Sequence, residues 1–228
     1  MMRLSIGHIG VALMFGVTSM LAAPAAQAQA EQRTLVSGAA LTLTSFLSDP
    51  DMAWLRRNFG RAKAVIIAPD IKKGSLIVGG ATGRAVVVAR NPKTGNWAGP
   101  AFYKVATASI GVQAGFSVSE MVSLVMTEKA LNTVLSESLT MGGNVAIGVG
   151  PIGAGSQSDF VADIVSFSRS AGVYVGADLN GTVVSAADDW NALYYGRPAH
   201  AVDILVRMNI NTRHARELLN LVATAAKN

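Results

Sequence analysis

Glycine recurs inside the apolar segments of this chain, and this pattern limits the fold more than any other feature. Many of the 23 glycines in the 228 residues lie in or beside runs of Val, Ile and Ala, such as "SLIVGG", "NVAIGVG" and "GVYVGAD". Within strands, glycine marks bends, bulges and places where another backbone approaches closely. The pattern therefore predicts a tightly curled, glycine-rich antiparallel sheet.

The stretch "GVGPIG", residues 148–153, matches the G-x-G-x-x-G fingerprint of dinucleotide-binding turns. That fingerprint requires a helix that begins inside it and an acidic residue about 20 positions further on. The following "AGSQSD" is too rich in Gly and Ser to open a helix, and the acidic position falls near Ser168 and Arg169. We interpret the stretch as a strand end and turn, with Pro151 ending the ladder, and expect no nucleotide cofactor.

The first thirty residues have the pattern of a secretory signal peptide. Arg3 precedes an apolar run from Ile9 to Leu21, and "AQA" at 26–28 or 28–30 supplies a cleavage site. A retained membrane anchor is the alternative. We expect an exported, periplasmic protein, associated peripherally with the membrane, whose residues 31–228 form a single domain.

The chain offers few groups for catalysis or metal binding. It contains no cysteine, which excludes disulfides and thiolate sites, and only His200 and His214 remain after the signal segment. Carboxylates such as Asp163, Asp188 and Asp189 leave an enzymatic alternative open, although a pair of acids at a helix start is typical of capping. We predict no catalytic residue, no metal site, no cofactor and no enzymatic activity.

Hydrophobic periodicity predicts an α+β fold. Apolar residues of "TLVSGAALTLTSFLS" share one helical face, and Asp49 with Pro50 predicts the start of a second helix. Thr127 is expected to cap a further helix, and the chain ends in an amphipathic helix. The centre predicts strands, including a hairpin around 81–83 and another at "LNG". The expected core is a curled or barrel-like sheet with N-terminal and C-terminal helices.

Positive charge is concentrated in one part of the chain. Residues 54–104 carry ten cations against one acid, whereas residues 105–228 carry seven cations against ten acids. Such asymmetry indicates an anionic partner, although dispersed solvated charges would give the same count. The predicted binding residues are Arg56, Arg57, Arg61, Lys63, Lys72, Lys73, Arg84, Arg90 and Lys93. Lys72 and Lys73 are expected on an exposed turn after Pro69, where their reversal to Glu should weaken binding.

Seven runs in order resemble the SYLF domain family, whose yeast members are known as actin-binding. They are "AKAVIIAPDIKKG", "VGGATGRAVVVAR", "WAGPAFYKV", "GVQAGFSVSEMVSLVMT", "GGNVAIGVGPIGAG", "ADIVSFSRSAGVYVGADLNGTVV" and "DDWNALYYG". The resemblance covers about residues 62–196. It implies a lipid-binding domain that in eukaryotic members recognises phosphoinositides, aided by an amphipathic N-terminal helix and basic residues.

These observations together predict non-enzymatic binding of anionic phospholipid at the membrane surface of the cell envelope. The basic segment would contact headgroup phosphates. The apolar face of the first helix would either enter the acyl boundary or pack on the core of the domain, and the sequence leaves both open. An exported protein meets phospholipid more readily than nucleic acid, so we expect no nucleic-acid partner. The alternative is a structural or interaction protein of the envelope that binds an acidic protein or polysaccharide.

Overall fold

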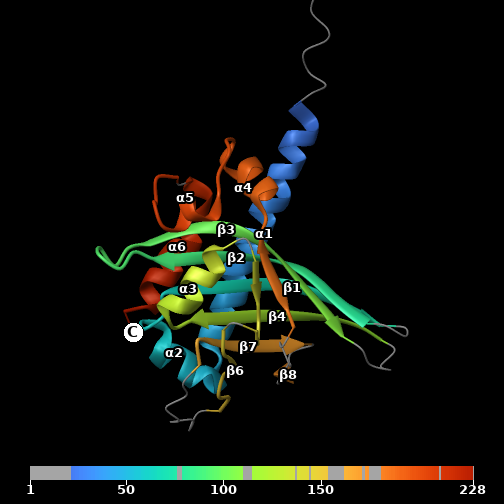
Figure 1. The fold of residues 1–228 in the computed structure, drawn as a ribbon, viewed down its shortest axis with the longest axis vertical. Helices are drawn as coiled ribbons and strands as arrows, with labels where there is room; N and C mark the ends of the chain where they lie inside the picture. Colours follow the sequence, from blue (N-terminus) through green and yellow to red (C-terminus); the bar gives the residue numbers. More distant parts are fainter. Residues whose placement is uncertain are drawn as a thin grey trace, which may run out of the picture.

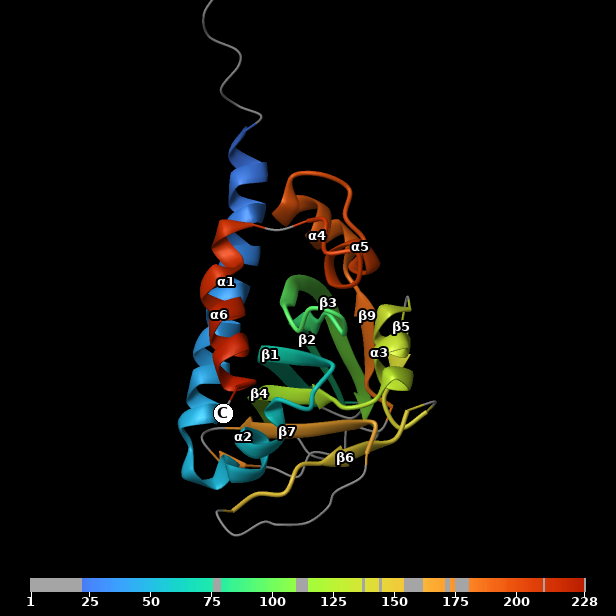
Figure 2. The same ribbon diagram turned by 90° about the vertical axis from the view of Figure 1, so that its left-hand side faces the viewer.

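The computed structural model describes residues 22–75, 79–109, 115–136, 138–143, 145–153, 162–170, 173–174, 181–210 and 212–227. One curled sheet forms the centre of the domain, with helices packed on both of its faces (Figures 1 and 2). The α+β prediction with helices at both ends of the chain is thereby confirmed.

Six α-helices lie in the described part of the chain: α1 (Ala22–Ser48), α2 (Ala53–Phe59), α3 (Glu128–Leu135), α4 (Asp188–Tyr195), α5 (Ala201–Leu205) and α6 (Arg216–Ala225). Short 3-10 helices, η1 (Pro50–Met52) and η2 (Arg213–Ala215), precede α2 and α6. The strands are β1 (Ala64–Ser75), β2 (Gly79–Arg90), β3 (Trp97–Ser109), β4 (Gly115–Val125), β5 (Ser138–Thr140), β6 (Ile147–Val149), β7 (Ile164–Ser170), β8 (Val173–Tyr174) and β9 (Val183–Ala186).

The strands form one sheet in the order β5-β9-β3-β2-β1-β4-β7-β6, with β8 beside β7. Neighbouring strands are antiparallel except for β6, which pairs parallel with β7. Four long strands, β1 to β4, make up its middle. Because residues alternate between the two faces of a strand, each long strand contributes to two cores.

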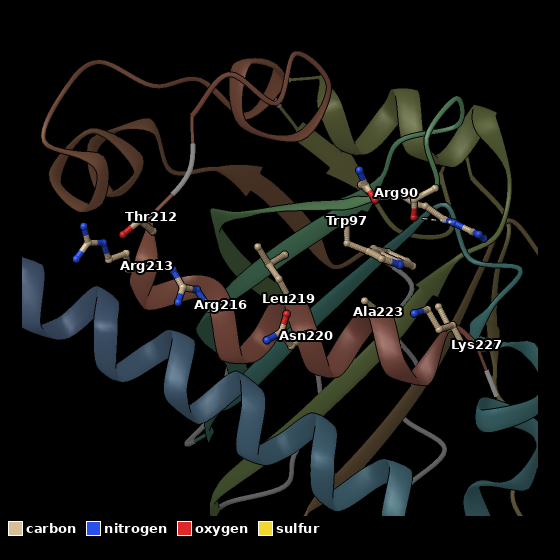
Figure 3. Close-up of a pocket in the computed structure, with 12 residues that line it drawn as sticks. Arg90, Trp97, Thr212, Arg213, Arg216, Leu219, Asn220, Ala223 and Lys227 are labelled. Carbon is tan, nitrogen blue, oxygen red and sulfur yellow. Dashed lines mark hydrogen bonds between the residues drawn. The ribbon is translucent and has the colours of Figure 1, made fainter.

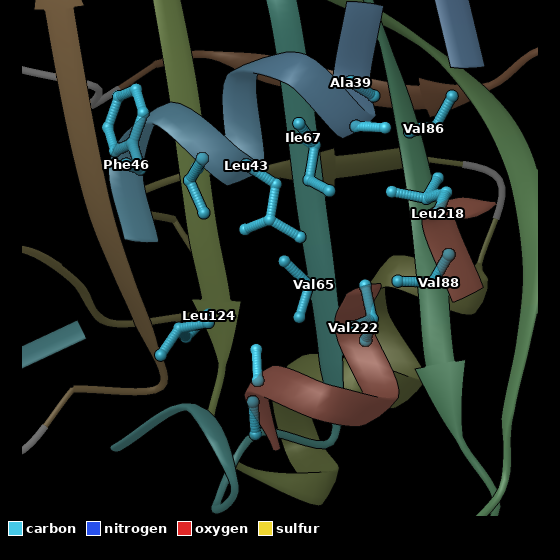
Figure 4. Packing of buried hydrophobic residues seen from close by; sticks show 14 of the residues in the cluster. Ala39, Leu43, Phe46, Val65, Ile67, Val86, Val88, Leu124, Leu218 and Val222 are labelled. Carbon is cyan, nitrogen blue, oxygen red and sulfur yellow. The ribbon is translucent and has the colours of Figure 1, made fainter. Parts of the chain in front are cut away.

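The first core lies between the sheet and helices α1 and α6 (Figure 4). Leu43 and Phe46 of α1 and Leu218 of α6 are fully buried against strand residues such as Val65 and Ile67. The predicted apolar face of α1 is therefore correct, and Leu41, which lies off that face, is 71% exposed.

Of the two alternatives for the apolar face of α1, this packing favours the core over the membrane. Val36, Leu43 and Phe46 are buried in the domain itself. Burial of each such side chain contributes about 1.5–3 kcal/mol, so detaching the three would cost roughly 5–9 kcal/mol. That amount is comparable with the whole stability of a typical domain, about 5–15 kcal/mol. The helix α1 is therefore part of the packed core.

The second core lies on the opposite face of the sheet. Strand residues such as Ile66, Val87 and Tyr103 pack there against α3 and α5, and α5 contributes Ile204 and Leu205. The hydroxyl of Tyr103 donates a hydrogen bond to the carbonyl of Val134 in α3, at 2.9 Å. Burial raises the pKa of this phenol well above its usual range, so the group stays neutral.

Pro69 does not end the first strand, which corrects the predicted turn at Lys72 and Lys73. The register of β1 shifts between Ile67 and Asp70 against β2, as at a β-bulge. A bulge leaves ladder positions unpaired, so a residue without an N–H is tolerated there. Both lysines are exposed, but they are consecutive strand residues and point to opposite faces of the sheet.

The expected hairpins are also relocated. Residues 81–83 lie within β2 and pair with both β1 and β3, so they form no turn. The predicted hairpin at "LNG" is wrong because β8 pairs with β7, while β9 pairs with β3 and β5. The residues of the "LNG" turn itself fall partly outside the described residues.

The "GVGPIG" stretch is a strand end, as predicted. β6 ends at Val149, and residues 150–153 are irregular, with no helix beginning in them. A Cβ added at Gly150 would lie 2.1 Å from the ring of Phe167, so only glycine allows the backbone to pass this side chain. The glycine serves packing.

The structure confirms the helix starts predicted at Asp49 and Thr127. The Asp49 side chain accepts a hydrogen bond from the Asp51 N–H at 2.9 Å, with Pro50 at the first position of η1. Thr127 caps α3 by accepting from the Ala130 N–H at 3.2 Å. The short elements α5 and β5 carry too few residues for a periodic pattern and were not predicted.

The helix α1 runs without interruption from Ala22, through both predicted cleavage sites, to Ser48. A mature chain that begins at Gln29 or Glu31 would therefore begin inside this helix. Most of the predicted signal segment lies outside the described residues. Among the helices that the structure describes, none combines the length and apolarity needed to cross a membrane.

Candidate anionic-ligand site

The nine predicted cations do not form one surface. Arg61, Lys63, Arg90 and Lys93 gather at the end of the sheet where the loop of residues 91–96 joins β2 to β3, which we call the turn end. Lys72 lies eight residues along β1 from Ala64, or about 26 Å of strand from that end.

Arg56 has a structural role in the observed geometry. Its guanidinium donates hydrogen bonds to the carbonyls of Leu47, Asp49 and Pro50, where α1 ends. Carbonyls in the last turn of a helix, such as that of Leu47, lack a partner within the helix, and a cation there also offsets the negative end of the helix dipole. Its neighbour Arg57 is exposed on the last turn of α2.

Arg84, Lys72 and Lys104 lie in a hollow of about 790 Å³ beneath the N-terminal half of α1, which we call the α1 groove. Its lining residues are Ala30, Glu31, Thr34, Leu35, Gly38, Pro69, Asp70, Lys72, Thr82, Gly83, Arg84, Lys104 and Trp190. The groove thus mixes apolar walls with charges of both signs.

Each cation of the α1 groove already has a partner. Lys72 pairs with Asp70 at 3.3 Å, and Lys104 pairs with Asp189 at 3.7 Å. The guanidinium of Arg84 lies over the Trp190 ring, 3.7 Å from its centroid, as in a cation–π contact. Carboxylates thus compensate the two lysines, whereas the Arg84 Nη1 is buried without a hydrogen-bond partner.

A second hollow, of about 620 Å³, lies between α6 and the β2–β3 turn (Figure 3); we call it the α6 cavity. It is lined by Arg90, Gly95, Asn96, Trp97, Thr212, Arg213, Arg216, Leu219, Asn220, Ala223, Ala226 and Lys227. Four of the lining residues are cations, and no lining residue is acidic.

Backbone carbonyls hold Arg90 in place at one wall of the α6 cavity. Its Nη1 donates to the carbonyl of Gly60 at 2.8 Å, and its Nε donates to that of Gly95 at 3.4 Å. These bonds satisfy part of the guanidinium without neutralising its charge. Arg90 therefore contributes a fixed positive potential.

The other cations of the α6 cavity come from the C-terminal segment. Arg213 and Arg216 are three residues apart, so they are neighbours along the helical surface where η2 leads into α6. Lys227 follows the other end of α6. All three side chains are exposed, and Figure 3 shows Trp97 and Leu219 between the two charged ends.

A smaller hollow of about 290 Å³ continues from the α6 cavity, since Arg90 and Gly95 line both. Arg61 and Lys63 line it, and its acidic residue, Glu128, pairs with Lys63 at 2.8 Å. Lys93 lies exposed in the adjoining loop. We define the basic face as this set of cations: Arg61, Lys63, Arg90, Lys93, Arg213, Arg216 and Lys227.

Sequence reasoning missed three members of the basic face. Arg213, Arg216 and Lys227 belong to a part of the chain with net negative charge, so counting along the sequence hid them. The usable signal was the three-residue spacing of Arg213 and Arg216 at the start of an amphipathic helix.

Among the described residues, no group of three or more His, Cys, Asp or Glu side chains could hold a metal ion. The family model "Ysc84: Las17-binding protein actin regulator" matches residues 106–225, more than half of the chain. The chain therefore belongs to the Ysc84 family, and the SYLF resemblance is confirmed. The matched region includes Arg213 of η2 and Arg216 of α6.

Individual relatives agree with this assignment. LAS seventeen-binding protein 3 of Saccharomyces cerevisiae is 31% identical over 169 residues, which is 65% of this chain and 36% of the relative. SH3 domain-containing YSC84-like protein 1 of Homo sapiens is 27% identical over 178 residues, 76% of this chain and 52% of the relative. The chain thus matches about a third to a half of the length of these relatives.

Proposed function

We propose that this domain binds anionic phospholipid at a membrane surface through the basic face. The observation that carries the proposal is the convergence of seven cations on one end of the sheet, where the lining residues of the two hollows include a single acid, Glu128. Lys63 is paired with this acid, and the remaining positive charge attracts an anionic surface.

The magnitude of the attraction suits reversible docking. Each Lys or Arg near an anionic membrane contributes about 1 kcal/mol, so four to seven cations give about 4–7 kcal/mol. That range corresponds to dissociation constants between about 1 mM and about 10 μM. No insertion of a helix is required to reach it.

The helix α1 has a different part in this proposal from the one its amphipathic pattern predicted. Its apolar face belongs to the core, and the Arg169 guanidinium fastens the helix to the sheet by contacting Glu120 at 2.5 Å and Ser45 at 2.9 Å. Thr42 also donates to Glu120, at 2.9 Å. The proposed docking therefore uses the domain with α1 in place.

An exported protein would meet phospholipid on the outer side of the inner membrane, and the periplasmic location remains part of the proposal. Intact-mass measurement of the exported protein tests it. We expect a chain that begins at Gln29 or Glu31, and retention of Met1 in that material would contradict the proposed export.

Vesicle co-sedimentation of the 31–228 chain tests the function. At low salt we expect binding to vesicles containing phosphatidylglycerol and no binding to phosphatidylcholine vesicles. Added salt should weaken the binding to phosphatidylglycerol vesicles steeply, because exposed charges are screened over about 8 Å at physiological ionic strength. Equal binding to both vesicle types would contradict the proposal. Absence of binding to either would favour the alternative, an acidic protein or polysaccharide as the partner.

A further inference from the structure

We propose that the α6 cavity binds the headgroup of a single phospholipid molecule, holding its phosphate ester at Arg213 and Arg216. The inference rests on the proposed function and deepens it. Electrostatic docking needs only a charged surface, whereas a headgroup site binds one lipid per domain and distinguishes between phosphate compounds.

The size of the hollow supports a bound molecule. Small-molecule sites in proteins typically occupy about 300–1,000 Å³, and the α6 cavity measures about 620 Å³. A flat patch of lysines would satisfy the electrostatic requirement without any hollow. The cations that line this cavity are instead arranged around a space that a headgroup and its glycerol could fill.

Phosphate recognition is the chemistry that these cations favour. Arginine offers a planar fork of donors that matches two phosphate oxygens, and three of the four cations here are arginines. Arg213 and Arg216 also lie where η2 and α6 begin, and the positive end of a helix dipole favours an anion in that position. Arg90 lies at the other end of the cavity, where its guanidinium bonds the carbonyl of Gly60, next to Ala226 at the end of α6.

The remaining lining residues favour a lipid over a bare phosphate ion. Trp97 and Leu219 form an apolar wall between the charged ends (Figure 3), and Asn96 and Asn220 add side-chain amides. Trp97 packs against Phe59 of the core, with ring centroids 6.4 Å apart, so its position is fixed. This combination matches a glycerol backbone attached to a phosphate.

The α1 groove is the larger hollow but a poorer candidate. Its three cations contact Asp70, Asp189 and Trp190, so an anionic headgroup would have to compete with existing partners. Glu31 and Asp70 among its lining residues would also repel a phosphate.

The test is calorimetric titration of the 31–228 chain with short-chain phosphatidylglycerol below its micelle concentration, followed in parallel through the Trp97 indole N–H by NMR. We expect one lipid per domain, a shifted Trp97 resonance, and weaker binding of glycerol 3-phosphate and of inorganic phosphate. If inorganic phosphate binds as tightly as the lipid, the assignment to a lipid headgroup is wrong.

A matched pair of tryptophan variants separates the cavity from the charge. Ala223→Trp fills the cavity and changes no charge, while Thr224→Trp places the same side chain on an exposed neighbour that does not line it. We expect at least a tenfold loss of short-chain lipid binding in the first variant and none in the second. Equal binding by both would overturn the headgroup site.

Vesicle binding distinguishes failure of this site from failure of the proposed function. If the wild-type domain binds anionic vesicles but no short-chain lipid, the headgroup site is wrong and electrostatic docking stands; if it binds neither, both are wrong. Should Ala223→Trp fail to fold in a thermal melt, Arg213→Gln with Arg216→Gln replaces it, and retention of short-chain lipid binding in that variant would overturn the proposal.

Discussion

The α6 cavity and the α1 groove both collect cations, but acidic residues line only the groove. In the groove, Lys72 and Lys104 are paired with carboxylates and Arg84 lies on an indole ring. In the cavity, Arg213 and Arg216 are exposed and no acidic residue contributes to the lining. The difference lies in what surrounds the charges.

This contrast explains why the nine cations predicted from the sequence do not form one site. A count along the chain treats residues 54–104 as one basic unit, whereas the sheet distributes them over two ends and two faces. The groove residues come from the most basic segment, yet the freest cations come from the segment with net negative charge. Pairing in three dimensions decides which charge is available.

The largest expected effect is a loss of stability where α6 packs on the sheet. Leu218 is fully buried between α6 and the sheet, so Leu218→Ala should lower the free energy of unfolding by about 2–5 kcal/mol. Chemical denaturation measures the change. Leu193→Ala, on the 42% exposed position of α4, is the control and should remain within about 0.5 kcal/mol. A loss below 1 kcal/mol at Leu218 would show that α6 is not anchored as described.

A smaller loss of stability is expected at Arg90, which differs in kind from the other cations of the basic face. Arg90→Ala removes hydrogen bonds to the carbonyls of Gly60 and Gly95 and should cost about 1–3 kcal/mol. The exposed Lys93 in the adjoining loop is the control, because Lys93→Ala should change stability by less than about 0.5 kcal/mol. Equal melting temperatures of Arg90→Ala and Lys93→Ala would contradict a structural role for Arg90.

A modest pH effect is expected beside the α1 groove, at α4. The Asp188 carboxylate, which the His200 ring contacts at 2.6 Å, raises the pKa of His200 through this hydrogen bond and its charge. A raised pKa stabilises the fold below the unfolded value, about 6.5, and the gain is lost as pH rises through the folded pKa. The free energy of unfolding of the wild type should exceed that of His200→Gln by a larger amount at pH 5.5 than at pH 8.5. The opposite order would contradict this pairing.

No effect on binding is expected from locking α1 to the sheet at the groove. A Cβ at Gly38 would lie 3.5 Å from the Cβ of Pro69, which is within disulfide range, and the chain has no other cysteine. Gly38→Cys with Pro69→Cys should bind anionic vesicles equally whether oxidised or reduced. Loss of binding on oxidation alone would show that α1 must leave the core, as its amphipathic pattern first suggested.

The sequence predicted local features well because they depend on neighbouring residues. The face of α1, the caps at Asp49 and Thr127 and the loop of residues 91–96 are set within a few positions of the chain. The path of β1 through Pro69 was missed because the bulge that accommodates it depends on pairing with β2 and β4. The α6 cavity was missed because its walls are more than 100 residues apart in the chain.

The central claim is that the basic face, and not the α1 groove, meets the anionic surface. Co-sedimentation with phosphatidylglycerol vesicles compares Arg213→Glu with Arg216→Glu against Lys72→Glu with Lys73→Glu, two variants with the same change of charge. At about 1 kcal/mol per cation, the first pair should lose at least about thirtyfold in affinity while the second loses little. An equal or larger loss from the Lys72 and Lys73 pair, with both proteins folded, would contradict the account.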